Sequence, residues 1–148
     1  MPANTSPIFS KNGAIESVLI TAANTSSQGG GTIGTDIFKA FTADATNGSF
    51  VQRVRFIPTA TTPTTTTATV GRVFISSVTS GATTSANTFL VGEITLPAIA
   101  ADNASTGVIW FDVMLGFAID PSFTVLVTNH AAPAANTAWR AVVVAGDY

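Results

Sequence analysis

No segment of useful length carries apolar residues at helical spacing, and this absence constrains the fold more than any other feature. Short runs rich in Val, Ile, Phe and Thr recur between clusters of Gly, Pro, Asn and Ser, a pattern typical of β-strands joined by turns. The Asn47-Gly48 dipeptide is the strongest turn signal, because both residue types tolerate a positive φ angle. The runs predict strands at residues 14–21, 36–43, 49–57, 69–77, 89–96, 107–115, 122–128 and 139–145.

The spacing between these strands indicates how they assemble. Intervals of roughly 10–15 residues favour a sandwich or barrel over a parallel sheet. We therefore predict an all-β protein, an antiparallel β-sandwich of about eight strands with a jelly-roll-like arrangement. An immunoglobulin-like Greek key is the alternative, since the pattern alone does not fix the strand order. Residues 1–13 are predicted to form an N-terminal arm, and residues 14–148 a single sandwich domain.

Charged side chains are unusually scarce. They make up 9% of the chain, compared with about 25% in an ordinary soluble domain, whereas the apolar fraction of 46% is close to normal. Thr, Ser, Ala and Asn replace the missing charges, so the surface lacks the repulsion that keeps monomers apart. We interpret this as a surface that partners cover in a permanent assembly. The alternative is a monomer with a threonine-rich surface.

The composition also argues against several classes of function. The six basic residues are scattered, with only Arg53 and Arg55 close together, whereas a nucleic-acid surface needs a dense basic face. No run approaches the roughly 20 apolar residues of a membrane span. Without cysteine, disulfides and thiolate zinc sites are excluded. The first eleven residues lack a secretory signal pattern, so we expect synthesis in the host cytoplasm.

Residues for catalysis or metal binding are few, and their context is weak. His130 is the single histidine, and no G-x-S-x-G elbow accompanies it, so an ordinary hydrogen bond or an intersubunit contact explains it better. Trp110 and Trp139 fall within strand patterns and are predicted to be core or interface residues. We predict no enzyme activity, no cofactor and no metal site. A glycosidase would need paired carboxylates, but we interpret the available ones as solvated strand ends: Glu93, Asp102, Asp112 and Asp120.

The order of segments along the chain carries a resemblance to a known group of proteins. The segments are IFKAFTA at 37–43, NGS at 47–49, VQRVRF at 51–56, ATVGRVFI at 68–75, EITLPA at 93–98, FTVLVT at 123–128 and VAGDY at 144–148. From about residue 17 onward, the chain resembles small β-sandwich virion proteins of tailed bacteriophages, of the capsid cement or decoration type. Residues 1–16, the Gly-rich loop and Ala145 depart from the pattern.

This resemblance implies a structural role without a reaction. It places the protein on the outer surface of a tailed-phage capsid, where it cements neighbouring major capsid subunits as a homo-oligomer, with a trimer favoured and a dimer as the alternative. Neither nucleic acid nor membrane is an expected partner. A tail or head-fibre protein with a receptor- or carbohydrate-binding module is the rival function. The expected interface residues are Ile8, Phe9, Trp110, His130, Trp139 and Tyr148.

Overall fold

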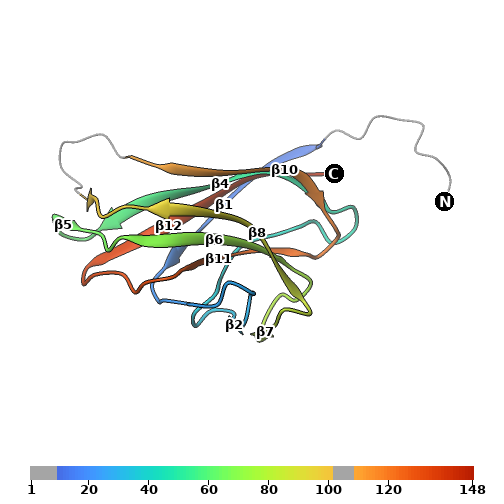
Figure 1. Ribbon diagram of the computed structural model, residues 1–148. Helices are drawn as coiled ribbons and strands as arrows, with labels where there is room; N and C mark the ends of the chain where they lie inside the picture. Colours follow the sequence, from blue (N-terminus) through green and yellow to red (C-terminus); the bar gives the residue numbers. More distant parts are fainter. Residues whose placement is uncertain (1–9, 102–108) are drawn as a thin grey trace.

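Two antiparallel four-stranded sheets pack face to face (Figure 1). The computed structural model describes residues 10–101 and 109–148. Sheet A has the strand order β1–β12–β4–β10, and sheet B has the order β3–β11–β6–β8. The eight strands are β1 (Asn12–Ile20), β3 (Phe38–Thr42), β4 (Ser49–Ala60), β6 (Thr69–Ser76), β8 (Thr88–Leu96), β10 (Phe111–Ile119), β11 (Thr124–Asn129) and β12 (Thr137–Asp147). The described ranges contain no helix, and the predicted all-β sandwich is confirmed.

The strand pairing is that of one long hairpin rolled into a sandwich. Among the eight long strands, the first pairs with the last, the second with the seventh, the third with the sixth and the fourth with the fifth. Consecutive strands therefore change sheets, except at the hairpin of β6 and β8. This is the jelly-roll order. The immunoglobulin alternative is wrong, because its first two strands share a sheet whereas β1 and β3 do not.

The Asn47-Gly48 turn is present, but it joins strands of different sheets. It closes the connection from β3 to β4, and of the two residues Gly48 alone has a positive φ, at 76°. A two-residue hairpin loop would need positive φ at both positions. The dipeptide therefore marks a crossover between the sheets.

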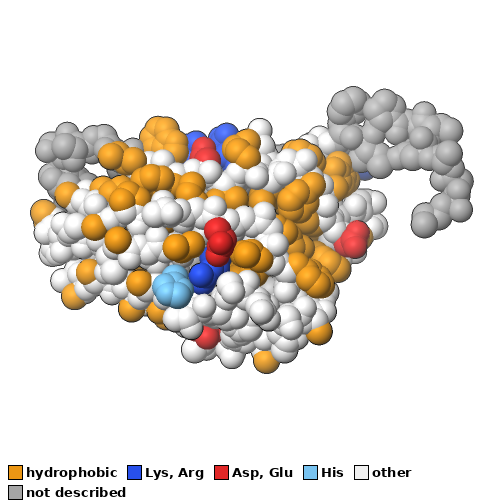
Figure 2. Space-filling view, viewed as in Figure 1, with side chains coloured by type: hydrophobic (Ala, Val, Ile, Leu, Met, Phe, Trp, Pro, Cys, Tyr) orange, Lys and Arg blue, Asp and Glu red, His pale blue; other side chains and the backbone are white. Residues whose placement is uncertain are grey.

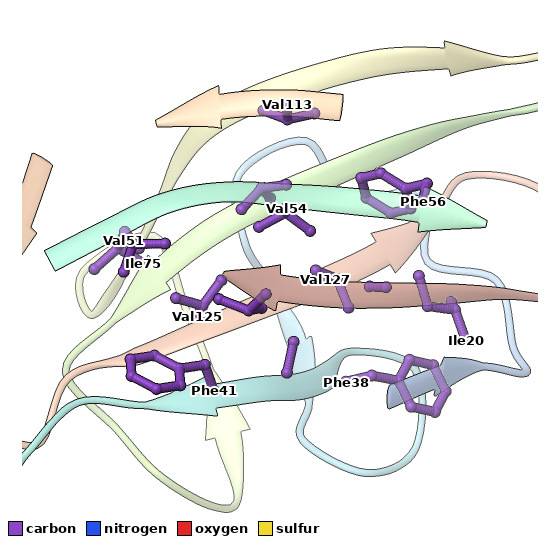
Figure 3. Packing of buried hydrophobic residues seen from close by; sticks show 14 of the residues in the cluster. Ile20, Phe38, Phe41, Val51, Val54, Phe56, Ile75, Val113, Val125 and Val127 are labelled. Carbon is purple, nitrogen blue, oxygen red and sulfur yellow. The ribbon is translucent and has the colours of Figure 1, made fainter. Parts of the chain in front are cut away.

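The core fills the space between the two sheets. Val54 and Phe56 of β4 are fully buried and face Val127 of sheet B, as Figure 3 shows. Val73 belongs to the same cluster. Side chains alternate between the two faces of a strand, so the inward-facing residues form this layer, and the alternation shifts where the strand register is irregular. Burial of these side chains fixes the register of both sheets, since a shift of one residue would expose the apolar side chains of the core.

Trp139 belongs to this core, with 1% of its surface exposed. Its ring meets that of Phe111 edge to face, with 5.9 Å between the centroids. It shares the inner face of β12 with Ala141 and Val143, both fully buried. Of the two predicted places for this tryptophan, core or interface, the structure gives the core, and its place among the interface candidates is corrected.

Two pairs of very short strands fasten the loops. β5 (Thr64–Thr65) pairs with β9 (Ala100–Ala101), and β2 (Gly31–Thr32) pairs with β7 (Ala82–Thr83). The β2–β7 pair lies below sheet B in Figure 1, on the side where a second small buried cluster forms from Ile37, Phe74 and Leu126. The outer face of sheet B is therefore partly covered by the chain's own loops.

The predicted boundary of the N-terminal arm lies too far along the chain. Asn12 and Gly13 already pair with Asp147 and Gly146 in β1, and the Lys11 N–H donates to the Asp147 carbonyl at 2.7 Å. Backbone pairing with the last strand, which no local pattern reveals, extends the domain toward the N-terminus. Residues 1–9, with the predicted contact residues Ile8 and Phe9, lie outside the described residues, and an arm there stays a prediction.

The strand predicted at 107–115 begins later, as β10 at Phe111. Ile109 and Trp110 precede the strand and are 56% and 53% exposed. The sequence predicts a strand that includes these two residues, and this prediction is wrong for them. An apolar run predicts that its side chains are covered, but it does not show whether the same chain or another protein covers them.

We predict that Gly48→Ala destabilises the fold more than Gly34→Ala does. Both glycines have a positive φ, 76° and 88°, which costs an alanine about 1 kcal/mol. At Gly48 an added Cβ would also collide with the Ile119 carbonyl, whereas at Gly34 it meets nothing within 4 Å. The free energy of unfolding in urea should fall by about 1 kcal/mol for Gly34→Ala and by at least about 2 for Gly48→Ala. Equal losses would contradict the collision.

Candidate functional site

The outer face of sheet A is the most distinctive surface of the described molecule. The strand register places side chains in rows across its four strands. One row runs from Ile15 through Val144 and Arg53 to Met114. The next row runs from Ser17 through Val142 and Arg55 to Asp112, and a third joins Leu19, Arg140 and Ile57.

Large apolar side chains are exposed along these rows. Ile15 is 74% exposed and Met114 64% exposed, and Trp110 flanks the face at 53%. Figure 2 shows basic and acidic side chains among hydrophobic ones along the upper edge of the molecule, over β10. Contiguous apolar groups of this kind on a soluble domain mark interaction surfaces, and Trp, Met and Arg are the residue types enriched at such sites.

An arginine, a carboxylate and a tryptophan form the polar centre of this face. Arg55 donates two hydrogen bonds to Asp112, from Nε at 2.7 Å and from Nη2 at 2.8 Å. Its guanidinium also lies 4.6 Å from the centre of the Trp110 ring, a cation–π distance. The hydrogen bonds from Arg55 lower the pKa of Asp112. This bidentate pair fixes both side chains and holds Trp110 out from the sheet.

Arg53, one row away, is less well satisfied. Its Nε is 4.0 Å from Asp112 Oδ2, too far for a hydrogen bond, and it is a buried polar atom without a partner in the described part of the chain. Its side chain is 30% exposed. The guanidinium is therefore only partly paired within the sandwich, and its Nε is shielded from solvent.

This face carries a net positive charge within a chain whose formal net charge is −2. Its rows hold three arginines, Arg53, Arg55 and Arg140, and a single carboxylate, Asp112. The result is +2 on the face. An apolar surface with a cationic centre is suited to a partner surface that is apolar and acidic.

The structure separates the predicted contact residues. Trp110 belongs to the outer face of sheet A, and Trp139 is in the core. His130 is exposed at the end of β11, on sheet B. Tyr148 lies at the opposite end of the sandwich, where its carbonyl accepts a hydrogen bond from Asn47 Nδ2 at 3.2 Å. The fold therefore does not bring these residues together into one site.

His130 lies beside an ion pair. Arg72, buried in β6, donates from Nε to Glu93 Oε1 at 2.6 Å, and its Nη1 lies 3.4 Å from His130 Nδ1. The hydrogen-bond contact of the ring in the described structure is therefore with a cation, which is no nucleophile. A structural contact explains this geometry better than a catalytic triad does.

The carboxylates considered for glycoside hydrolysis are in different surroundings. Asp112 and Glu93 are each paired with an arginine, so neither is a free carboxyl group that could face a second one across a cleft. Asp120 is exposed beyond the end of β10, and Asp102 lies outside the described residues. The geometry offers no facing pair of free carboxylates among the described ones.

The described surface includes two grooves near strand ends and edges. The larger, about 400 Å³, is lined by Leu19, Arg140 and residues of the β4 and β12 ends, without an aromatic side chain. The smaller, about 240 Å³, lies where the free edges of β8 and β10 meet, and three phenylalanines line it, Phe89, Phe117 and Phe123. We call the smaller one the phenylalanine groove.

Comparison with protein families, curated proteins and solved structures finds no match to this chain. No group of three or more potential metal ligands occurs among the described residues. Within the same ranges, no helix is long and apolar enough to cross a membrane. Function must therefore be argued from the surfaces themselves.

Sequence reasoning missed most of this surface. Trp110 was among the predicted contact residues, but Ile15, Met114 and the Arg55–Asp112 pair were not. One available signal was that Arg53 and Arg55, two residues apart in a strand, point to the same face. Their partner in the sequence is 57 positions away, and only the sheet register identifies it.

We predict that the contribution of Asp112 to stability depends on pH. Its folded pKa is lowered from 3.8, so its stabilising effect is fully present above that value and is lost as the pH falls through the folded pKa. Since the pair is about one quarter exposed, Asp112→Asn should reduce the free energy of unfolding by at most about 1 kcal/mol at pH 7. The difference from the unmodified protein should approach zero well below pH 3.8. A difference that is constant with pH would contradict this pairing.

Proposed function

We propose that this protein is a structural virion protein that binds the outer surface of a tailed-phage capsid and cements neighbouring major capsid subunits. The observation that supports it most strongly is the outer face of sheet A, where Ile15, Met114 and Trp110 are exposed beside the cationic side chains of Arg53 and Arg55. A surface of this composition is stabilised when another protein covers it. The order of segments in the sequence supplies the virion context.

Cementing needs no chemistry, and the jelly-roll provides what it does need. A domain that binds only the assembled shell stabilises that shell by mass action, by about 2.7 kcal/mol per site at one hundred times the dissociation constant. Repetition over a closed lattice adds further stabilisation through multivalency. The sandwich is also poor in charge, which lowers the cost of desolvating its surface.

A carbohydrate- or receptor-binding module at a fibre is the second candidate, and the exposure of Trp110 favours it. Exposed tryptophan can stack on a sugar ring. One face of this ring, however, is already occupied by the Arg55 guanidinium, and the larger groove has no aromatic lining. A glycan array with the purified protein tests this module, and reproducible binding would replace the capsid proposal.

The decisive experiment for the capsid proposal locates the chain on purified particles of the phage that encodes it. A low-resolution particle map should show its density on the outer shell between major capsid subunits. Met114→Glu should fold with unchanged stability yet occupy the shell at least about tenfold less, because it places a charge in the apolar face. Thr95→Glu, at an exposed position of β8, is the matched control and should bind normally. Absence of the chain from purified particles would refute the proposal.

The arm is tested separately by deleting residues 1–9. The described domain begins its pairing at Lys11, and Ser10 packs against Gly146, so the truncation spares the sheet. The shortened protein should keep its thermal midpoint but lose shell occupancy, because Ile8 and Phe9 are expected to contact a neighbouring subunit. Unchanged occupancy on particles would remove the arm from the proposal and leave the sandwich contact in place.

A further inference from the structure

One end of the sandwich carries a cluster of carboxylates. Asp147 pairs in register with Ser49, and the Ser49 hydroxyl donates to Asp147 Oδ1 at 2.5 Å. The same hydroxyl oxygen accepts the N–H of Asp44 at 2.9 Å. Asp120 directly follows the residue of β10 that pairs with Ser49. We call this part, Asp44, Asp120 and Asp147 with the nearby Lys11, the acidic end, and its net charge is −2.

Its carboxylates are partly accessible. Asp120 is exposed, and Asp44 and Asp147 are half-buried. The backbone N–H groups of Asn47 and Thr46 lower the pKa of Asp44, and Lys11 adds a smaller effect in the same direction. These contacts favour the charged form of Asp44.

The acidic end also has apolar side chains beside it, because it adjoins the phenylalanine groove. Asp120 contributes to the lining of that groove together with Phe117 and Phe123. Phe89, on the facing edge strand β8, is 50% exposed. Asp120 beside these phenylalanines is the chemical complement of the outer face of sheet A, where Arg53 lies in one row with Ile15 and Met114.

We propose that the acidic end of one copy docks on the outer face of sheet A of a second copy. Each surface supplies what the other lacks, a net charge of −2 against +2 and apolar side chains on both. This inference rests on the proposed function and deepens it, because it assigns the outer face of sheet A to the contact between copies on the shell and leaves the rest of each sandwich for the capsid subunits.

The alternative self-contact, sheet A against sheet A, is disfavoured by charge. It would bring two faces of +2 together, and like charges in apposition oppose association. The size of the face also suits an ordinary interface. Four strands about 4.8 Å apart and about nine residues long span on the order of 570 Å² before side-chain relief is counted, comparable to the roughly 800 Å² that each partner buries in a standard complex.

Such a contact joins two different patches of the same chain. A heterologous contact of this kind closes into a ring when the rotation between copies permits it. In such a ring, the free edge strands and the remaining surface of every copy stay available to contact the capsid. The predicted homo-oligomer then follows from one repeated interface.

The test is charge reversal on the purified full chain, with the oligomeric state followed by analytical ultracentrifugation. Arg140→Glu and Asp120→Arg, each alone, should weaken association at least about tenfold, which corresponds to about 1.4 kcal/mol. The two changes in one chain should leave association weak, because both surfaces then have a net charge of zero. Lys39→Glu, an exposed charge reversal on β3 of sheet B, is the control and should associate like the unmodified protein.

Mixing the two single variants gives an independent readout. Only one of the two reciprocal contacts is then favourable, so the mixture should form pairs in place of closed rings. A monomeric unmodified chain, or association that neither reversal weakens, would overturn the inference. So would association of the double variant as strong as that of the unmodified protein. Shell occupancy measured separately shows whether the proposed function survives such a result.

Discussion

The position of β12 between β1 and β4 is the constraint on which the rest of the structure depends. The last strand pairs with the first over nine residues and with β4 over eleven register positions. Its inner face supplies Trp139, Ala141 and Val143 to the core. Its outer face carries Val142 and Val144, which connect the residues of β1 to the arginines of β4. The core and the candidate surface are thus two faces of one strand register.

Because charges are scarce, a few of them determine how the surface behaves. Two arginines are neutralised within the fold, Arg55 by Asp112 and Arg72 by Glu93. The remaining charges fall unevenly, positive on the outer face of sheet A and negative at the acidic end. In a chain with ordinary charge content, such a difference of a few units would be masked by neighbouring ions. Here neutral Thr, Ala and Ser surround it, so it gives the molecule polarity and a preferred orientation toward partners.

The two sheets differ in how their outer faces are covered. The outer face of sheet B packs part of its area against the chain's own loops, around Phe74 and Leu126. The outer face of sheet A has no comparable layer among the described residues, although it displays apolar side chains of similar size. Large apolar side chains are thus covered on the outer face of sheet B and exposed on the outer face of sheet A, where another protein can contact them.

The sequence by itself determined the fold class, the approximate number of strands and the lack of ordinary surface charge, because alternation and turn residues are local properties. It predicted Trp110 as a contact residue, but not its neighbours Arg55 and Asp112. Only the tertiary structure decided the jelly-roll order, the burial of Trp139 and the position of Asp112 beside Arg55. These depend on pairing between strands far apart in the chain, where each choice of neighbour satisfies the same local pattern and the shared core selects one of them.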